Sequence, residues 1–245
     1  MIELQQLYKA FEGRTVLNNI STRFEPSKAN MVIGTSGSGK TVLMKCVVGL
    51  VRPDQGRILY DGRDFTAMTF EETKEIRADI GMLFQGSALF DSKTVEENVA
   101  FPLEMFTQKS AAEIKERVDF CLDRVRLYHA HHLLPAEISG GMQKRVGIAR
   151  AIALNPKYLF CDEPNSGLDP RTASIIDNLI KEITEEYRIT TVINTHDMHS
   201  MYTIGDKVLF LNKGEKCFDG HPNDIEAAGI DELNQMIDPT LAPKE

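Results

Sequence analysis

The segment GTSGSGKT, residues 34–41, decides the fold of this chain. It matches the pattern G-x-x-x-x-G-K-[ST], in which glycines let consecutive backbone N–H groups point at phosphate oxygens, the lysine reaches the β- and γ-phosphates and the hydroxyl reaches Mg²⁺. A flexible glycine-rich turn is the alternative. The flanking sequence favours a phosphate loop, because NMVIG at 30–34 predicts a short buried strand and TVLMKCVVGL at 41–50 predicts an apolar helix. The pattern therefore predicts nucleotide binding by Gly34, Thr35, Ser36, Gly37, Ser38, Gly39, Lys40, Thr41 and Val42.

The composition is that of an ordinary globular chain. Its 245 residues are 42% hydrophobic and 26% charged, which suits one large α/β domain or two small ones. The formal net charge of −8 argues against a broad nucleic-acid footprint and against polybasic attachment to anionic lipid. The N-terminal MIELQQLYKAF has neither the cationic nor the apolar region of a secretory signal, and no run approaches about 18 uncharged apolar residues. We therefore expect a cytoplasmic chain that spans no membrane and binds no nucleic acid.

The cysteines point to the same compartment. None is spaced as C-x-x-C, and at least three lie in apolar runs. Scattered cysteines of this kind predict reduced, packed thiols at Cys46, Cys121, Cys161 and Cys217.

Strand and helix patterns alternate along most of the chain. Alternating polar and apolar residues in IELQQL and VLNNISTRFE predict antiparallel strands ahead of the phosphate loop. Helical patterns between most of the later strand-like runs favour a largely parallel sheet with crossover helices. Those later runs lie at 56–62, 79–85, 157–163, 190–196 and 207–214.

The middle of the chain changes to a mostly helical character. Ser110 and Glu113 form a capping-box pattern, and core-type residues follow it at helical spacing: Ile114, Val118, Leu122 and Val125. We expect one α/β domain of residues 1–245 with an N-terminal antiparallel β subdomain. Its subdivisions are a nucleotide-binding core at 1–85 and 156–222, a helical insertion at 86–155 and a C-terminal tail at 223–245.

Two acids close an apolar strand in YLFCDE, residues 158–163. A strand that ends in Asp162 can place this carboxylate beside the phosphate loop, where it holds Mg²⁺ through water or together with Thr41. Glu163, one residue later, can orient and deprotonate an attacking water. Ordinary strand-end carboxylates are the alternative, but the preceding phosphate loop favours a hydrolytic pair.

The segment EISGGMQKRVGIARAIALNP at 137–156 supplies a second candidate phosphate contact. Ser139, Gly140 and Gly141 precede a helical run, whose first turn offers free backbone donors and a hydroxyl to an anion. The alternative is a simple helix cap with a glycine hinge.

Set between a phosphate loop and a DE strand, this segment resembles the signature motif of the ATP-binding cassette ATPases. Phe11 is similar to the aromatic residue that stacks on adenine in that family, and Gln85 is similar to the Q-loop glutamine. Ser166-Gly-Leu-Asp169 resembles the D-loop, and His196 resembles the switch histidine. The motifs follow in the family's order and cover nearly the whole chain.

The resemblance implies a P-loop NTPase fold of the RecA-like type, with ATP and Mg²⁺ as cofactors. It implies a head-to-tail homodimer, in which Ser139, Gly140, Gly141 and Asp169 of one chain complete the nucleotide site of the other. Within each site, the implied roles are charge neutralisation by Lys40, Mg²⁺ binding by Thr41, Gln85 and Asp162, water activation by Glu163, and contact with the γ-phosphate by His196.

Some residues depart from the family pattern. The signature reads ISGGMQ, so Met142 stands where glutamine is commonest, and the usual Gly-Glu is absent from SKANMVIG. We expect activity to survive, because Ser139 and its two glycines carry the phosphate contact. The segment YHAHH at 128–132 suggests a metal site, but a solvated loop after a helix is the simpler interpretation.

The resemblance extends to transporter ATPases, which act on the cytoplasmic face of the inner membrane with a membrane permease. The resemblance implies that Gln85 and the following segment, 86–98, form part of the groove for a permease helix. GKTVLMK, FQGSALFDSKTVEENVAFPLE and SGGM together look most like the ATPases of the Mla/Mce-associated lipid transporters, which implies an MCE-type substrate-binding partner. The alternatives are a polar-solute importer, a lipoprotein-releasing system, or a non-transport ATP switch.

Overall fold

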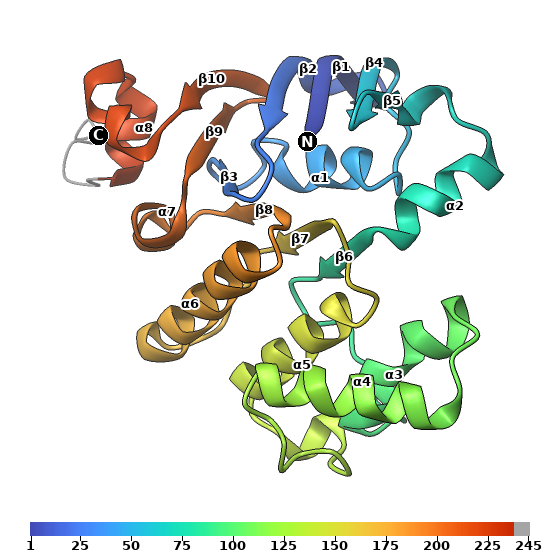
Figure 1. Cartoon of the computed structure of the whole chain (residues 1–245). Coiled ribbons are helices and arrows are strands. Elements are labelled where there is room, and N and C mark those ends of the chain that lie inside the picture. The colour runs from blue at the N-terminus through green and yellow to red at the C-terminus, as the bar shows by residue number, and fades with distance from the viewer. Residues whose placement is uncertain (238–245) are drawn as a thin grey trace. The chain divides into compact units, whose positions relative to one another are not determined.

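The computed structural model describes residues 1–237 and divides them into two compact units (Figure 1). Unit 1 combines residues 1–76 with the described chain from Thr190 onward, and unit 2 is Arg77–Ile189. The predicted C-terminal tail lies within the description only up to residue 237. The predicted subdivisions at 85, 155 and 222 remain predictions.

Unit 1 begins with an antiparallel sheet of four strands in the order β2, β1, β4, β5. The alternation seen in the sequence explains it, since Ile2, Leu4 and Leu7 are almost completely buried. The predicted antiparallel N-terminal subdomain is therefore confirmed. Its strands are β1 (Ile2–Phe11), β2 (Arg14–Phe24), β4 (Gln55–Tyr60) and β5 (Arg63–Asp64).

Strand β4 belongs to this antiparallel sheet. The sequence pattern placed its run, 56–62, with the runs expected to form the largely parallel sheet, and for this run that expectation is wrong. Ile2 lies opposite Tyr60 and Leu4 lies opposite Ile58 in the antiparallel pairing of β1 with β4. The sequence between the two strands contains the phosphate loop and its helix, so their pairing is set by tertiary contacts and not by a local turn.

The parallel strands of unit 1 surround β3 (Ala29–Ile33), all five residues of which are buried. Its neighbours are β8 (Thr190–Thr195) and β9 (Lys207–Asn212), both parallel to it. Such strands read as continuous apolar runs because parallel sheets are covered on both faces. The antiparallel β10 (Glu215–Gly220) pairs with β9. The remaining helices are α1 (Lys40–Val47), α2 (Phe70–Ala78), which contains the boundary between the units, α7 (Met198–Ile204) and α8 (Asp231–Ile237).

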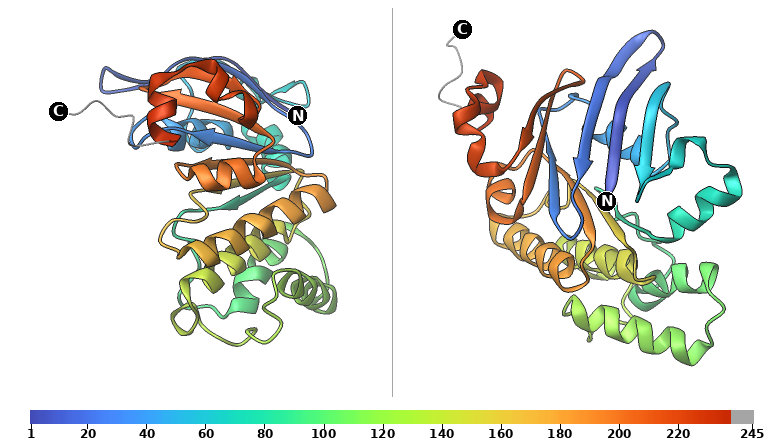
Figure 2. Two further views of the ribbon diagram at one scale, coloured as in Figure 1. Left: turned by 90° about the vertical axis from the view of Figure 1, so that its left-hand side faces the viewer. Right: turned by 45° about the horizontal axis from the view of Figure 1, so that its top comes forward.

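Unit 2 joins two parallel strands to four helices. β6 (Ile80–Leu83) pairs with β7 (Tyr158–Asp162), and Leu83 lies opposite Cys161. Figures 1 and 2 show α3, α4 and α5 packed against one another. This is the helical character predicted for the middle of the chain. The helices are α3 (Val95–Phe106), α4 (Ala111–Arg124), α5 (Gly140–Ile152) and α6 (Pro170–Glu186).

The predicted capping box begins α4 as expected. Ser110 accepts a hydrogen bond from the Glu113 amide, and the Glu113 carboxylate accepts one from the Ser110 amide. Of the four predicted core residues, Val118, Leu122 and Val125 are buried, while Ile114 is partly exposed. Cys46, Cys121 and Cys161 are buried free thiols as predicted, but Cys217 is exposed on the edge strand β10.

Candidate active site

The phosphate loop joins β3 to α1 and has a backbone that only glycine fits well. Gly34, Gly37 and Gly39 have φ values of 154°, 80° and 106°. A Cβ added to Gly34 would lie 2.3 Å from the Leu211 carbonyl oxygen, and one on Gly39 would lie 2.8 Å from that of Val16. The glycines therefore serve backbone geometry and close packing, which a merely flexible turn does not require.

Lys40 lies inside this loop. Its side chain is buried, and Nζ donates hydrogen bonds to the carbonyl oxygens of Gly34 at 2.7 Å and Thr35 at 3.1 Å. The buried hydroxyl of Ser38 has no hydrogen-bond partner among the described residues. A buried hydroxyl is costly without a partner, so Ser38 offers a polar group to a bound oxyanion. Thr35, Ser36 and Thr41 are exposed and accessible to the same ligand, while Val42 is partly buried.

His196 lies at the same sheet edge as the phosphate loop. In the parallel pairing of β3 with β8, Ile33 lies opposite Thr195, so Gly34 and His196 are the next residue of each strand at the carboxyl edge. Ligands of open α/β sheets bind at this edge.

Phe11, at the end of β1, is 46% exposed, with Lys9 Nζ 5.1 Å from its ring centroid. Its ring face is thus able to accept a cation or a base.

Unit 2 brings together Gln85, Glu163 and Ser166. Because Leu83 lies opposite Cys161, residues 85 and 163 leave their strands at one edge. Gln85 Nε2 lies 3.3 Å from Ser166 Oγ, and the Ser166 amide donates to the Glu163 carbonyl oxygen at 3.1 Å. Asp162 and Glu163 are partly exposed. The predicted metal and water-activating carboxylates thus emerge together at the end of β7.

Lys144 is the residue of this network that sequence reasoning missed. Its Nζ donates hydrogen bonds to the carbonyl oxygens of Gln85 and of Glu163, the second at 3.3 Å. Burial lowers the pKa of Lys144, and Asp162 and Glu163 act in the opposite direction. Gln143 and Arg145 flank Lys144 in the same helix, so no local pattern distinguished this lysine from an exposed one.

The signature segment forms the start of α5. Ser139 is the N-cap of α5 and accepts a hydrogen bond from the Met142 amide at 3.3 Å. The helix cap is therefore present, and the phosphate contact of Ser139 stays a prediction. Ser139 and Gly140 are exposed. A Cβ added to Gly141 would lie 2.5 Å from Thr172 Cγ2, so this glycine allows α5 and α6 to approach closely. The exposed turn retains the amides that an anion could use.

Asp169 caps α6 in the same way. Its carboxylate accepts hydrogen bonds from the amides of Arg171 and Thr172, both at 3.1 Å, and from the Thr172 hydroxyl at 2.6 Å. These bonds lower the pKa of Asp169. Within the described chain this carboxylate serves its own helix, and its contribution to a second chain stays a prediction.

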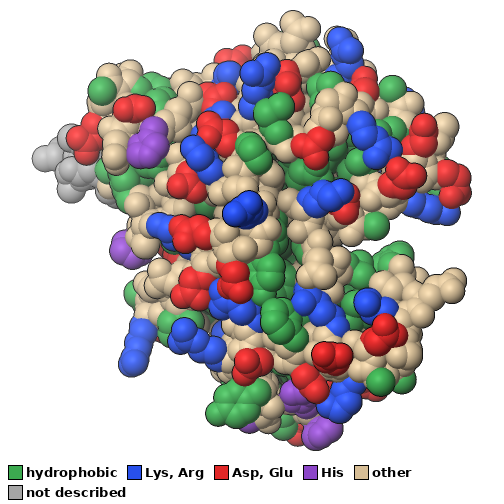
Figure 3. Space-filling model, viewed as in Figure 1, with side chains coloured by type: hydrophobic (Ala, Val, Ile, Leu, Met, Phe, Trp, Pro, Cys, Tyr) green, Lys and Arg blue, Asp and Glu red, His purple; other side chains and the backbone are tan. Residues whose placement is uncertain are grey.

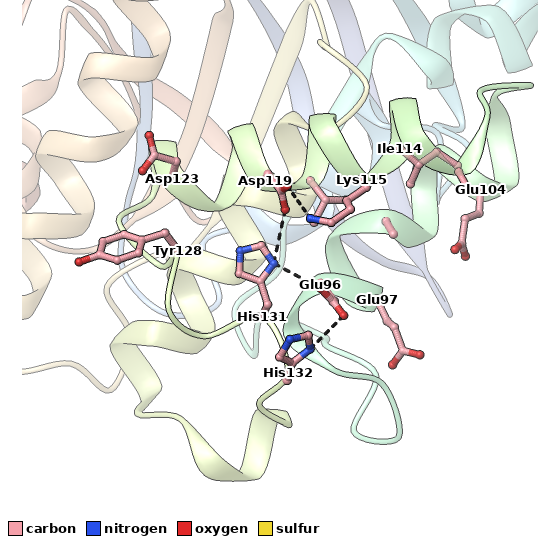
Figure 4. Close-up of a pocket in the computed structure, with 13 residues that line it drawn as sticks. Glu96, Glu97, Glu104, Ile114, Lys115, Asp119, Asp123, Tyr128, His131 and His132 are labelled. Atoms are coloured by element: carbon pink, nitrogen blue, oxygen red, sulfur yellow. Dashed lines mark hydrogen bonds and ion pairs between the residues drawn. The ribbon is translucent and has the colours of Figure 1, made fainter.

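Two histidines of YHAHH, His131 and His132, line a cavity of about 810 Å³ between α3 and α4 (Figure 4). His131 Nδ1 lies 3.3 Å from Glu96 and 3.6 Å from Asp119, and His132 Nδ1 lies 3.2 Å from Glu96. Lys115 pairs with Asp119 on the same wall. Residues 1–237 contain no group of three or more His, Cys, Asp or Glu arranged to hold a metal ion. His131 and His132 thus lie within reach of the carboxylates of Glu96 and Asp119.

Charges of both signs are mixed over the surface. Figure 3 shows Lys and Arg interspersed with Asp and Glu on the face displayed, without a broad basic area among the described residues of that face. No helix within residues 1–237 combines the length and the apolar character needed to cross a bilayer.

Residues 17–166 of this chain match the ABC transporter family. The methionine import ATP-binding protein MetN of Histophilus somni is 40% identical over 229 residues, which are 92% of this chain and 66% of that protein. The probable ribonucleotide transport ATP-binding protein of Mycobacterium leprae is 39% identical over 86% of this chain and 60% of that protein. The chain thus spans about two thirds of the length of the curated relatives it matches.

A solved ABC transporter cassette has the same fold. It was determined as a dimer and superimposes with a TM-score of 0.83 at 31% identity, covering 91% of this chain and 99% of that one. A second structure of that cassette is a post-hydrolysis dimer bound to ADP and Pi, with a TM-score of 0.82. The α/β fold expected from the sequence is thereby confirmed.

Proposed function

Because this chain belongs to the ABC transporter family, we propose that it binds ATP with Mg²⁺, hydrolyses it and powers transport through a separate membrane permease. The observation that carries the proposal is the phosphate loop, where Lys40 and three constrained glycines lie at the same sheet edge as His196. The chain is an ATPase and ATP is its cofactor; a cassette that is 31% identical over 91% of this chain has been determined with ADP and Pi.

Each residue group has a part in hydrolysis. Lys40 and the loop amides neutralise charge on the phosphates, and the Ser38 hydroxyl donates to a phosphate oxygen. Thr41, Asp162 and Gln85 are the residues that would hold Mg²⁺, and the ion would neutralise charge on the phosphates. Glu163 accepts the proton of the attacking water, and His196 contacts the γ-phosphate.

Two chains form the active unit. A dimeric cassette is among the solved relatives, and the exposed Ser139 and Gly140 turn of this chain is suited to reach a phosphate held by a partner. In this arrangement Asp169 also lies near the dimer contact. The permease holds the dimer at the cytoplasmic face of the inner membrane.

Replacing Lys40 tests the phosphate loop, and Lys45 provides a matched control on the same helix. Lys40→Ala should lose most nucleotide affinity and turnover, because the ammonium beside the β- and γ-phosphates is gone. Lys45→Ala should keep both, since Lys45 is exposed. Nucleotide binding and phosphate release would be measured for both variants, and equal effects would contradict the loop's role.

For the cargo, we infer a small polar solute taken up by an importer. The supporting observation is the 40% identity to a methionine import ATP-binding protein over 92% of this chain. The second candidate is phospholipid, with an MCE-type protein as partner, and it rests on the resemblance of GKTVLMK, the segment at 84–104 and SGGM to lipid-transporter ATPases.

The purified complex with its permease can separate these cargoes. L-methionine, supplied with the system's solute-binding protein, should stimulate ATP hydrolysis if the chain serves an importer of that class. Stimulation by phosphatidylglycerol vesicles together with the MCE-type protein, and not by methionine, would favour the lipid transporter instead.

A further inference from the structure

Lys144 occupies an unusual place for a lysine. It is 4% exposed within α5, and its two hydrogen bonds go to main-chain carbonyl oxygens and not to a carboxylate. Burying an ammonium group is expensive unless it is well hydrogen-bonded, whereas methionine or leucine would fill a similar volume without that cost. A lysine at this position therefore needs an explanation, and the two carbonyl groups that its ammonium contacts supply one.

These carbonyl groups belong to the two segments that the proposed hydrolysis depends on. Gln85 follows β6 and Glu163 follows β7, and the two strands pair directly. Glu163 has a φ of 47°, a backbone conformation uncommon for residues other than glycine. Its carbonyl oxygen accepts hydrogen bonds from the Ser166 amide and from Lys144 Nζ, and these bonds hold the conformation in place.

A second side chain of α5 contacts the same loop. Arg150 donates hydrogen bonds to the carbonyl oxygens of Ser87 at 2.6 Å and Ala88 at 2.8 Å. Ser87 and Ala88 also have positive φ values, 59° and 47°. Lys144 and Arg150 thus attach Gln85 and the two residues at 87–88 to α5, whose N-cap is the signature residue Ser139.

We propose that Lys144 is a positioning residue that ties the Gln85 segment to the backbone of Glu163, so that a displacement of this segment is transmitted to the catalytic carboxylate and to α5. The inference rests on the proposed function, because it assigns a role within ATP hydrolysis. Lys144 acts through Gln85 and Glu163, and it requires no contact with nucleotide or metal. Arg150 supports the same segment without contacting Glu163.

The test compares Lys144→Met, which keeps the volume and removes the donors, with Lys144→Gln, which keeps one shorter donor group. In the complex with its permease, Lys144→Met should lower kcat by about 10- to 100-fold with the KM for ATP changed less than about threefold, because the base is misplaced while the phosphate loop is intact. Lys144→Gln should recover part of the loss. Lys115→Met, which removes an exposed lysine of α4, is the control and should change neither constant.

Amide hydrogen exchange supplies a readout that does not depend on activity. Lys144→Met should speed exchange in both segments, 85–88 and 163–168, while Lys115→Met should speed it in neither. Faster exchange in only one segment, or a kcat equal to wild type, would overturn the proposal. If Lys144→Met fails to fold, Lys144→Gln decides by the same two measurements. A wild-type complex without ATPase activity would refute the proposed function, yet the exchange experiment would still test the link between the segments.

Discussion

At the scale of single residues, the backbone of Glu163, the proposed general base, has an uncommon conformation that specific hydrogen bonds hold. The residue follows directly after β7, its φ is positive, and its carbonyl oxygen is held by Ser166 and Lys144. A general base has to be held within reach of the water it activates. These two hydrogen bonds to its carbonyl oxygen fix the backbone from which the Glu163 side chain extends.

Glu163→Gln should separate binding from turnover. The amide keeps the shape but cannot accept the proton, while Lys40 and Thr41 still hold the nucleotide. We expect ATP affinity at least equal to wild type, turnover lower by about 10²- to 10⁴-fold, and accumulation of an ATP-bound dimer. Nucleotide binding and phosphate release would be measured with the membrane subunit present. Near-normal turnover would leave Glu163 as an ordinary strand-end carboxylate.

At the scale of elements, the helix caps of α4 and α5 provide a matched pair. Ser110 and Ser139 are both N-caps that accept one amide hydrogen bond, at 3.4 Å and 3.3 Å. Replacing either with alanine should reduce the free energy of unfolding by about 1 kcal/mol. Only Ser139→Ala should also reduce ATP hydrolysis, by about 10²-fold if its hydroxyl contacts the γ-phosphate. Equal activity of the two variants would make Ser139 a cap alone.

The permease contact can be tested in the segment before α3. The buried Asn98 holds this segment by hydrogen bonds with the backbone of Phe90, Lys93 and Thr94, and leaves the Phe90 ring 40% exposed beside Phe101. Phe90→Asp should weaken copurification with the permease more than it weakens ATP binding by the isolated chain. Phe120→Asp, at a comparably exposed phenylalanine of α4, is the control. An unchanged complex for Phe90→Asp would place the docking surface elsewhere.

The sequence predicted those elements whose signals are local. The buried strand before GTSGSGKT, the capping box at Ser110 and the strand that ends at Asp162 are all present, because each depends on neighbours within a few residues. The pairing of β4 with β1 and the contact of Lys144 with Gln85 could not be predicted. Both join residues about 50 or 60 positions apart, and no periodic pattern encodes such a partner.

At the scale of the whole molecule, the account depends on a site shared between two chains. Ser139, Gly140 and Asp169 are exposed and lie at the starts of α5 and α6, whereas Lys40 is enclosed by its own loop. The residues proposed to close on the γ-phosphate are thus free to meet a partner. In the proposed dimer, one chain supplies the phosphate loop and the other supplies the signature turn.

The most direct measurement mixes two inactive variants, Lys40→Ala and Ser139→Arg, and follows phosphate release in the presence of the membrane subunit. In each homodimer, both sites lack either a working phosphate loop or a working signature turn. A heterodimer contains one complete site. This site combines the intact phosphate loop of the Ser139→Arg chain with the intact signature turn of the Lys40→Ala chain. The account predicts that mixing restores part of the wild-type rate, while each variant alone stays inactive. No recovery in a mixture shown to contain heterodimers, or full wild-type activity in a demonstrably monomeric preparation, would contradict it.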